Sequence, residues 1–230
     1  MPFDSLPAWI RGDRYALLLI SLVATLFLQP LFAHEQTSRV FSSVCLTLVF
    51  LTGVLANRHR KAVCAVALVL ALAAILLGWI CPSDSLGFFK IRLVVDLVFL
   101  GFTAVMIFIA VVKDRMPGIH AVLGAICVYL LLGLTWAYGY RLVECVEPES
   151  FRFTEQLLDT TTPSEQPLTK KTQMIYFSFV TMSTLGYGDI TPRTPLAQTV
   201  TWMQAVTGQF YLIILIAKLV NELPKRHEHR

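Results

Sequence analysis

The stretch TQMIYFSFVTMSTLGYGD, residues 172–189, decides how this chain folds. Its apolar first part, residues 172–184, is too short to span a membrane, because a helix of that length reaches only about 20 Å. Non-helical backbone at membrane depth is tolerated only where protein buries it or water lines it. A half-length helix followed by glycine-rich sequence therefore predicts a re-entrant segment beside a pore.

The composition indicates that this segment belongs to a membrane protein. The 230-residue chain is 56% hydrophobic and only 15% charged, whereas an average soluble domain has about 25% charged residues. These values exclude disordered, collagen-like and disulfide-rich secreted chains, and they disfavour a soluble enzyme. The basic residues behind the net charge of +4 are scattered between apolar runs. We therefore expect membrane lipids as partners and no nucleic acid.

Six apolar runs of 17 to 22 residues are long enough to cross a membrane. Each is predicted to be a helix, because backbone polar groups in lipid must be satisfied internally. The predicted spans are residues 15–32, 40–56, 62–80, 93–112, 119–140 and 199–220. The expected fold class is an all-α membrane protein with six transmembrane helices and a re-entrant pore helix. A secretory signal peptide is the alternative interpretation of the first run.

The distribution of Lys and Arg predicts the orientation of these helices. With the N-terminus inside, the short inner loops hold five basic residues and the short outer loops hold three. We therefore expect a multi-pass protein of the plasma or cytoplasmic membrane. Residues 1–14 and 221–230 would be short cytoplasmic tails, with no room for a ligand-binding domain.

The glycines of residues 184–189 indicate a specific chemistry. A cation that loses its water needs a dense ring of oxygens, which backbone carbonyls supply when consecutive ones face one axis. That geometry needs alternating backbone handedness, which Gly186 and Gly188 adopt without a Cβ clash. The hydroxyl of Thr184 is a further acceptor at the inner end, and Asp189 is expected at the outer mouth. The C-terminal end of the short helix directs partial negative charge toward a waiting cation.

This segment resembles the selectivity filter of tetrameric potassium channels through Thr184, Leu185, Gly186, Tyr187, Gly188 and Asp189. The resemblance extends over an outer helix at 119–140, an extracellular turret at 141–171, a pore helix at 172–184, the filter at 184–189 and an inner helix at 199–220. It implies passive, selective conduction of K⁺, which is the permeant ion and not a cofactor. K⁺ would be held by Thr184, Leu185, Gly186 and Tyr187. Because each chain carries one filter segment, a homotetramer is expected.

The same resemblance assigns roles to residues of the inner helix. Gly208 follows Asp189 by nineteen positions, where the family has a gating hinge. A small residue at a helix–helix contact is the alternative role for Gly208. In the same register, Gln209 and Leu212 would face the cavity below the filter, and Ile216 would lie near the inner constriction.

The pore helix departs from the family at three positions. Tyr176 and Phe177 stand where many members have a pair of tryptophans, the first of which bonds the filter aspartate. The Tyr176 hydroxyl can donate with a different reach, whereas Phe177 cannot donate. Asp189 is therefore expected to bond Tyr176, water or a neighbouring chain. Val180 stands where some members have a glutamate behind the filter.

The first four helices, residues 15–118, do not form a voltage sensor. Such a sensor needs several basic residues at every third position of its fourth helix, and residues 93–112 contain neither Lys nor Arg. We expect little or no intrinsic voltage dependence. Asp96 lies inside this helix, four residues after Arg92. The two form either a local structural pair or a site that senses pH or ions.

Several alternatives stay open at this point. Residues with the spacing of a catalytic or metal site are absent from the sequence, so we do not expect an enzyme. A weakly selective cation channel, a potassium transporter and a non-conducting regulatory subunit are the remaining classes; a transporter would need repeated pore segments, and the chain has one. Cys81 and Cys145 both fall in outer connections, where a disulfide is conceivable.

Overall fold

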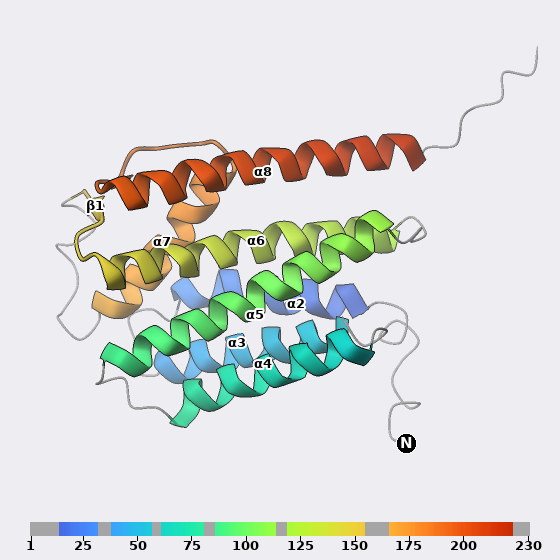
Figure 1. Cartoon of the computed structure of the whole chain (residues 1–230), viewed down its shortest axis with the longest axis horizontal. Helices are drawn as coiled ribbons and strands as arrows, with labels where there is room; N and C mark the ends of the chain where they lie inside the picture. Colours follow the sequence, from blue (N-terminus) through green and yellow to red (C-terminus); the bar gives the residue numbers. More distant parts are fainter. Residues whose placement is uncertain are drawn as a thin grey trace, which may run out of the picture.

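The computed structural model describes residues 14–31, 38–56, 61–80, 86–113, 119–154 and 166–222. These residues form helices and one short antiparallel ladder of two strands. The elements are α2 (Arg14–Leu31), α3 (Ser38–Ala56), α4 (Lys61–Ile80), α5 (Leu86–Lys113), α6 (Ile119–Val146), β1 (Phe151–Phe153), α7 (Gln166–Met182), β2 (Ile190–Pro192) and α8 (Pro195–Glu222). The long helices share one general direction, and α7 crosses them obliquely (Figure 1).

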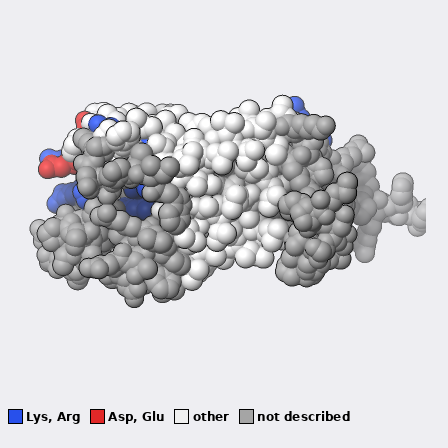
Figure 2. Space-filling model, turned by 90° about the horizontal axis from the view of Figure 1, so that it is seen from below, with Lys and Arg blue, Asp and Glu red and all other residues white. Residues whose placement is uncertain are grey.

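Three of the described helices are long and apolar enough to cross a membrane. They cover Gly87–Lys113, His120–Val146 and Pro195–Lys218. Shorter apolar helices occupy Tyr15–Leu28, Ser43–Leu55 and Ala62–Leu77. Figure 2 shows a broad band without charged residues along the middle of one face. The helices are those of a multi-pass membrane protein.

Local sequence explains why several elements differ from the predicted bounds. α6 continues to Val146 and ends just before Pro148, because the residue preceding a proline is disfavoured in helix. α7 begins at Gln166, six residues before the predicted start, and carries Pro167 in its first turn, where proline lacks only a hydrogen bond that no helix makes there. α8 begins at Pro195, behind a Thr194 hydroxyl that accepts from a backbone N–H at 3.4 Å.

Two short strands, β1 and β2, accompany the helices. β1 lies within the predicted turret and pairs antiparallel with β2, which directly follows Asp189. Phe151 faces Pro192 in register, and Phe153 faces Ile190. Each strand has only three residues, so neither shows the alternation by which longer strands are recognised.

The main apolar core is formed by helices α2 to α6, and residues of α7 and α8 pack against it. Leu18, Phe99 and Leu131 are fully buried in it, and the rings of Phe50 and Phe99 meet edge-on at 4.6 Å. α6 is shared, since it packs against α2 and α5 as well as against α7 and α8. In contrast, α8 leaves much of its apolar surface uncovered in the single chain.

Candidate functional site

The candidate site is the irregular segment that leaves the C-terminal end of α7. Thr184, Gly186 and Gly188 have positive φ values of 62°, 56° and 81°, whereas Leu185 and Tyr187 do not. The backbone therefore alternates in handedness over five residues. A Cβ on either glycine would meet no atom within 4 Å, so backbone conformation, and not crowding, favours glycine here.

Hydrogen bonds to the last turn of α7 fix the start of this segment. The N–H groups of Ser183, Thr184 and Leu185 donate to the carbonyls of Phe179, Thr181 and Val180 at 2.9, 3.1 and 3.0 Å. The helix end thus passes directly into the alternating backbone. Val180 stands where some potassium channels have a glutamate. Its side chain is buried, and its backbone carbonyl accepts the Leu185 N–H.

Asp189 closes the segment at its other end. The Tyr176 hydroxyl donates to Oδ2 of Asp189 at 2.7 Å, and the Ile190 N–H donates to Oδ1 at 3.0 Å. The backbone carbonyl of Asp189 accepts two bonds from Thr154, from N–H at 3.1 Å and from the hydroxyl at 3.0 Å. Of the partners expected for the aspartate, the structure contains Tyr176.

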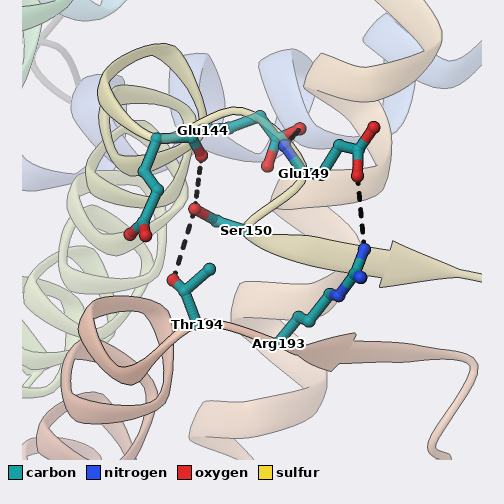
Figure 3. A network of polar contacts seen from close by, with 6 residues as sticks. Glu144, Glu149, Ser150, Arg193 and Thr194 are labelled. Atoms are coloured by element: carbon teal, nitrogen blue, oxygen red, sulfur yellow. Dashed lines mark hydrogen bonds and ion pairs between the residues drawn. The ribbon is translucent and has the colours of Figure 1, made fainter.

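Thr154 reaches Asp189 because the register of the β1–β2 ladder places the two residues opposite each other, and contacts at the other end of the ladder hold the strands together. Arg193 Nη1 and Glu149 Oε2 form an exposed ion pair at 3.2 Å, and the hydroxyl of Thr194 donates to that of Ser150 at 3.4 Å (Figure 3). The Arg193 N–H also donates to the Ser150 carbonyl at 2.7 Å. The turn before β1 is therefore tied to the turn after β2.

A buried polar network joins α6, α7 and α8 behind the segment. Gln204 of α8 donates to the carbonyl and hydroxyl of Ser178 on α7, at 2.9 and 2.7 Å, and accepts from the Tyr140 hydroxyl of α6. The Ser178 hydroxyl donates to the carbonyl of Gly133 at 2.6 Å. These side chains are fully buried. None of these three residues was among the predicted site residues, although polar residues inside apolar helices are the signal that marks them.

Aromatic packing adds to this network. The ring centroids of Tyr140, Phe151 and Phe177 lie 5.0 to 5.5 Å apart, a range that is favourable for tilted aromatic pairs. Phe177 thus has no polar role and anchors α7 against α6 and β1. Gly133 allows α7 to lie close to α6, because a Cβ at this position would lie 2.5 Å from the Phe179 ring.

The inner-helix candidates divide into one buried and three exposed residues. Gly208 is buried against α7, where a Cβ would lie 2.6 Å from Met182 Cγ and 3.2 Å from the Met182 carbonyl oxygen. This is the close helix contact expected of a small residue, and its role as a hinge stays a prediction. Gln209, Leu212 and Ile216 are exposed in the single chain.

The structure also brings the predicted pair Arg92 and Asp96 together. Nε of Arg92 lies 3.8 Å from Oδ2 of Asp96, which is buried. Cys145 forms no disulfide within the described part of the chain, and Cys81 lies outside the described residues. The possible disulfide between them therefore stays a prediction.

Comparison with known proteins agrees with this geometry over the second half of the chain. Residues 124–225 match a protein family described as "Ion channel". A stretch of 68 residues is 35% identical to "Two pore potassium channel c" of Oryza sativa subsp. japonica, which covers 30% of this chain and 15% of that protein. No solved structure matches the chain. These similarities support an ion channel, and they point to a membrane transport protein and not to an enzyme.

Proposed function

We propose that the chain is a potassium-selective channel that conducts K⁺ passively through residues 184–189. The observation that carries this proposal is the alternating backbone at Thr184, Gly186 and Gly188, which continues from a helix end and is held at Asp189. Such backbone directs successive carbonyls to one side, as a ring of ion ligands requires. In this proposal Thr184, Leu185, Gly186 and Tyr187 hold the ions. The name of the rice relative supports K⁺ as the ion.

A homotetramer with six spans per chain completes the proposed channel. Leu185 and Tyr187 are 59% and 66% exposed in the single chain, although both are large and apolar or aromatic. The same is true of Trp202, Phe210 and Ile213 on α8. Neighbouring copies around a fourfold axis would cover these side chains and place four filter segments around one pore. Both termini are proposed to be cytoplasmic.

The charge distribution of α5 supports channel opening that is independent of voltage. Its basic residues are Lys90, Arg92 and Lys113, which all lie near the helix ends. A charge contributes to voltage gating only by moving through the field, at about 2.3 kcal/mol per 100 mV for a full crossing. A steep conductance–voltage curve with several gating charges per subunit would contradict this part of the proposal.

Flux measurements on purified protein test the main proposal. We expect liposomes that contain the protein and a K⁺ gradient to show K⁺ flux that barium blocks, and reversal potentials in K⁺ and Na⁺ mixtures that favour K⁺. Absence of flux would favour a non-conducting subunit, and equal permeability would favour a weakly selective cation channel. Either result would overturn the proposal.

A matched pair of glycine variants connects the flux to the backbone geometry. Gly186→Ala and Gly87→Ala both add a methyl group that meets no atom within 4 Å. Only Gly186 has a positive φ, which alanine adopts at a cost of about 1–2 kcal/mol. We expect Gly186→Ala to lose selective flux while Gly87→Ala keeps it. Equal behaviour of the two variants would remove the structural basis of the proposal.

A further inference from the structure

The side chain of Tyr211 joins the inner half of α8 to α5 and α6. Residues 209–218 of α8 are all described, and Tyr211 is the only buried one among them. Its hydroxyl donates to the backbone carbonyl of Ala125 on α6 at 2.5 Å. Its ring centroid lies 5.9 Å from that of Phe108 on α5 and 6.2 Å from that of Tyr129 on α6. A single side chain of the inner helix therefore contacts two of the preceding helices.

The outer half of α8 is attached to the pore helix α7. Gln204 donates to the carbonyl and hydroxyl of Ser178 at 2.9 and 2.7 Å. Gly208 lies so close to α7 that a Cβ there would be 2.6 Å from Met182 Cγ. Tyr211 follows Gly208 by three residues, which is about 4.5 Å along a helix axis. Gly208 therefore lies between an anchor on α7 and an anchor on α5 and α6, and glycine is among the residues that least stabilise a helix interior.

The position of Tyr211 around the helix axis determines which way this contact draws α8. At about 100° per residue, Gln209 and Ile216 lie about 160° and about 140° around the axis from Tyr211. Both are exposed in the single chain, and in the proposed channel they face the cavity and the inner constriction. Tyr211 then faces away from the pore axis. Its bond to Ala125 therefore holds the inner half of α8 away from that axis.

We propose that Tyr211 is a positioning residue for gating: its contacts with α5 and α6 hold the inner half of α8 in the conducting position, and when they open, this half moves about Gly208 toward the axis and closes the pore. The inference rests on the channel function proposed above and concerns the regulation of that same pore. Because Phe108 belongs to α5, a movement of α5 changes the support of Tyr211. The first four helices thus act on the inner helix without a voltage-sensing charge.

Single-channel recordings of Tyr211→Phe test the proposal. The substitution removes the hydroxyl and keeps the ring, so only the bond to Ala125 is lost. A neutral hydrogen bond changes an equilibrium constant by about fivefold, and we expect the ratio of open to closed time to fall by that factor. The unitary current and the reversal potential should not change, because residues 184–189 are untouched. An unchanged or higher ratio would overturn the proposal.

Tyr129→Phe is the matched control for the loss of a hydroxyl. It removes the same atom from the adjacent ring, and within the described part of the chain the Tyr129 hydroxyl makes no hydrogen bond. We expect this variant to keep the unmodified ratio of open to closed time. Phe108→Leu removes the ring contact from α5 and should lower the ratio, with an effect that is not additive with that of Tyr211→Phe. Equal ratios in the two phenylalanine variants would contradict the role of Tyr211.

Amide hydrogen exchange separates this inference from the channel function, because it requires no conduction. In detergent we expect Tyr211→Phe to speed the exchange of residues 209–217 by about fivefold, through local opening of the inner half of α8. Residues 199–207, which Gln204 anchors to α7, should exchange as in the unmodified protein, and so should both segments in Tyr129→Phe. Faster exchange without any flux would refute the proposed function and keep the anchor. Equal exchange in the two variants would refute the anchor itself.

Discussion

Tyr176→Phe tests how the proposed filter segment, residues 184–189, is held at Asp189. The substitution removes one hydroxyl and leaves the ring, so only the 2.7 Å bond to Oδ2 of Asp189 is lost. Three bonds at this end remain, namely the Ile190 N–H to Oδ1 and the two from Thr154 to the carbonyl of Asp189. We therefore expect the segment to loosen without detaching.

The magnitude follows from the chemistry and exposure of the bond. A hydrogen bond to a charged group contributes about 1.5–3 kcal/mol. Because Tyr176 is 39% exposed, water partly replaces the lost donor, and the lower end of that range applies. A loss of about 1.5 kcal/mol corresponds to about tenfold. We expect the channel to enter a non-conducting state about tenfold more readily when external K⁺ is replaced by Na⁺, measured as the decay of current in planar bilayers.

A double-mutant cycle provides the decisive control for this prediction. Tyr176→Trp, which keeps an N–H donor on an aromatic ring, should restore part of the stability of the current. In the cycle that combines Tyr176→Phe with Asp189→Asn, the two residues should show a coupling energy of about 1 kcal/mol, because contacting residues are not additive. A decay rate in Tyr176→Phe equal to that of the unmodified protein, or a coupling energy near zero, would refute the reasoning.

Three further substitutions, two of them with a matched control variant, test the packing around residues 184–189. Gln204→Leu removes a buried amide with two polar partners, and we expect it to lower the free energy of unfolding by about 2–4 kcal/mol. Gln209→Leu, on the exposed surface of the same helix, should change it by less than about 0.5 kcal/mol. Gly208→Ala places a methyl group against Met182 and should cost about 1–3 kcal/mol in thermal unfolding; an unchanged Tm would show that the contact yields freely. Thr154→Val removes one of two bonds to the last filter carbonyl and should speed current decay less than Tyr176→Phe does, whereas Thr154→Ser should not; equal decay in both variants would refute the role of the hydroxyl.

The helices and the alternating backbone of residues 184–188 were predictable from local sequence. Long apolar runs fix helices because backbone groups in lipid have no other partner. The observed bounds of α2, α3 and α4 lie within two residues of the predicted ones, whereas α5 begins at Leu86, seven residues before its predicted start. The alternating backbone was predicted at Gly186 and Gly188, because glycine adopts positive φ without a Cβ clash. In the structure Thr184 has a positive φ as well. Helix ends were less predictable, since caps and prolines moved α6, α7 and α8 by several residues.

The contacts that hold residues 184–189 were not predictable in the same way. Gln204 and Ser178 are 26 positions apart, and Thr154 and Asp189 are 35 apart. No local sequence pattern predicts such a pair, because the packing of α6, α7 and α8 determines which residues meet. Lys171 shows the same limit: the sequence placed it at the end of a polar turret, whereas in the structure it belongs to α7 and is buried.

The contacts that support residues 184–189 within the single chain lie mostly on one side of this segment. Behind the segment, Ser178 and Gln204 are buried and hydrogen-bonded to each other, and Tyr176 holds Asp189 at the end of the segment. In front of it, the side chains of Leu185 and Tyr187 remain exposed in the single chain. The chain thus supports residues 184–189 from behind but not from the side. We expect the missing contacts to come from adjacent copies in the proposed homotetramer, so the geometry of this segment should be lost when those copies dissociate.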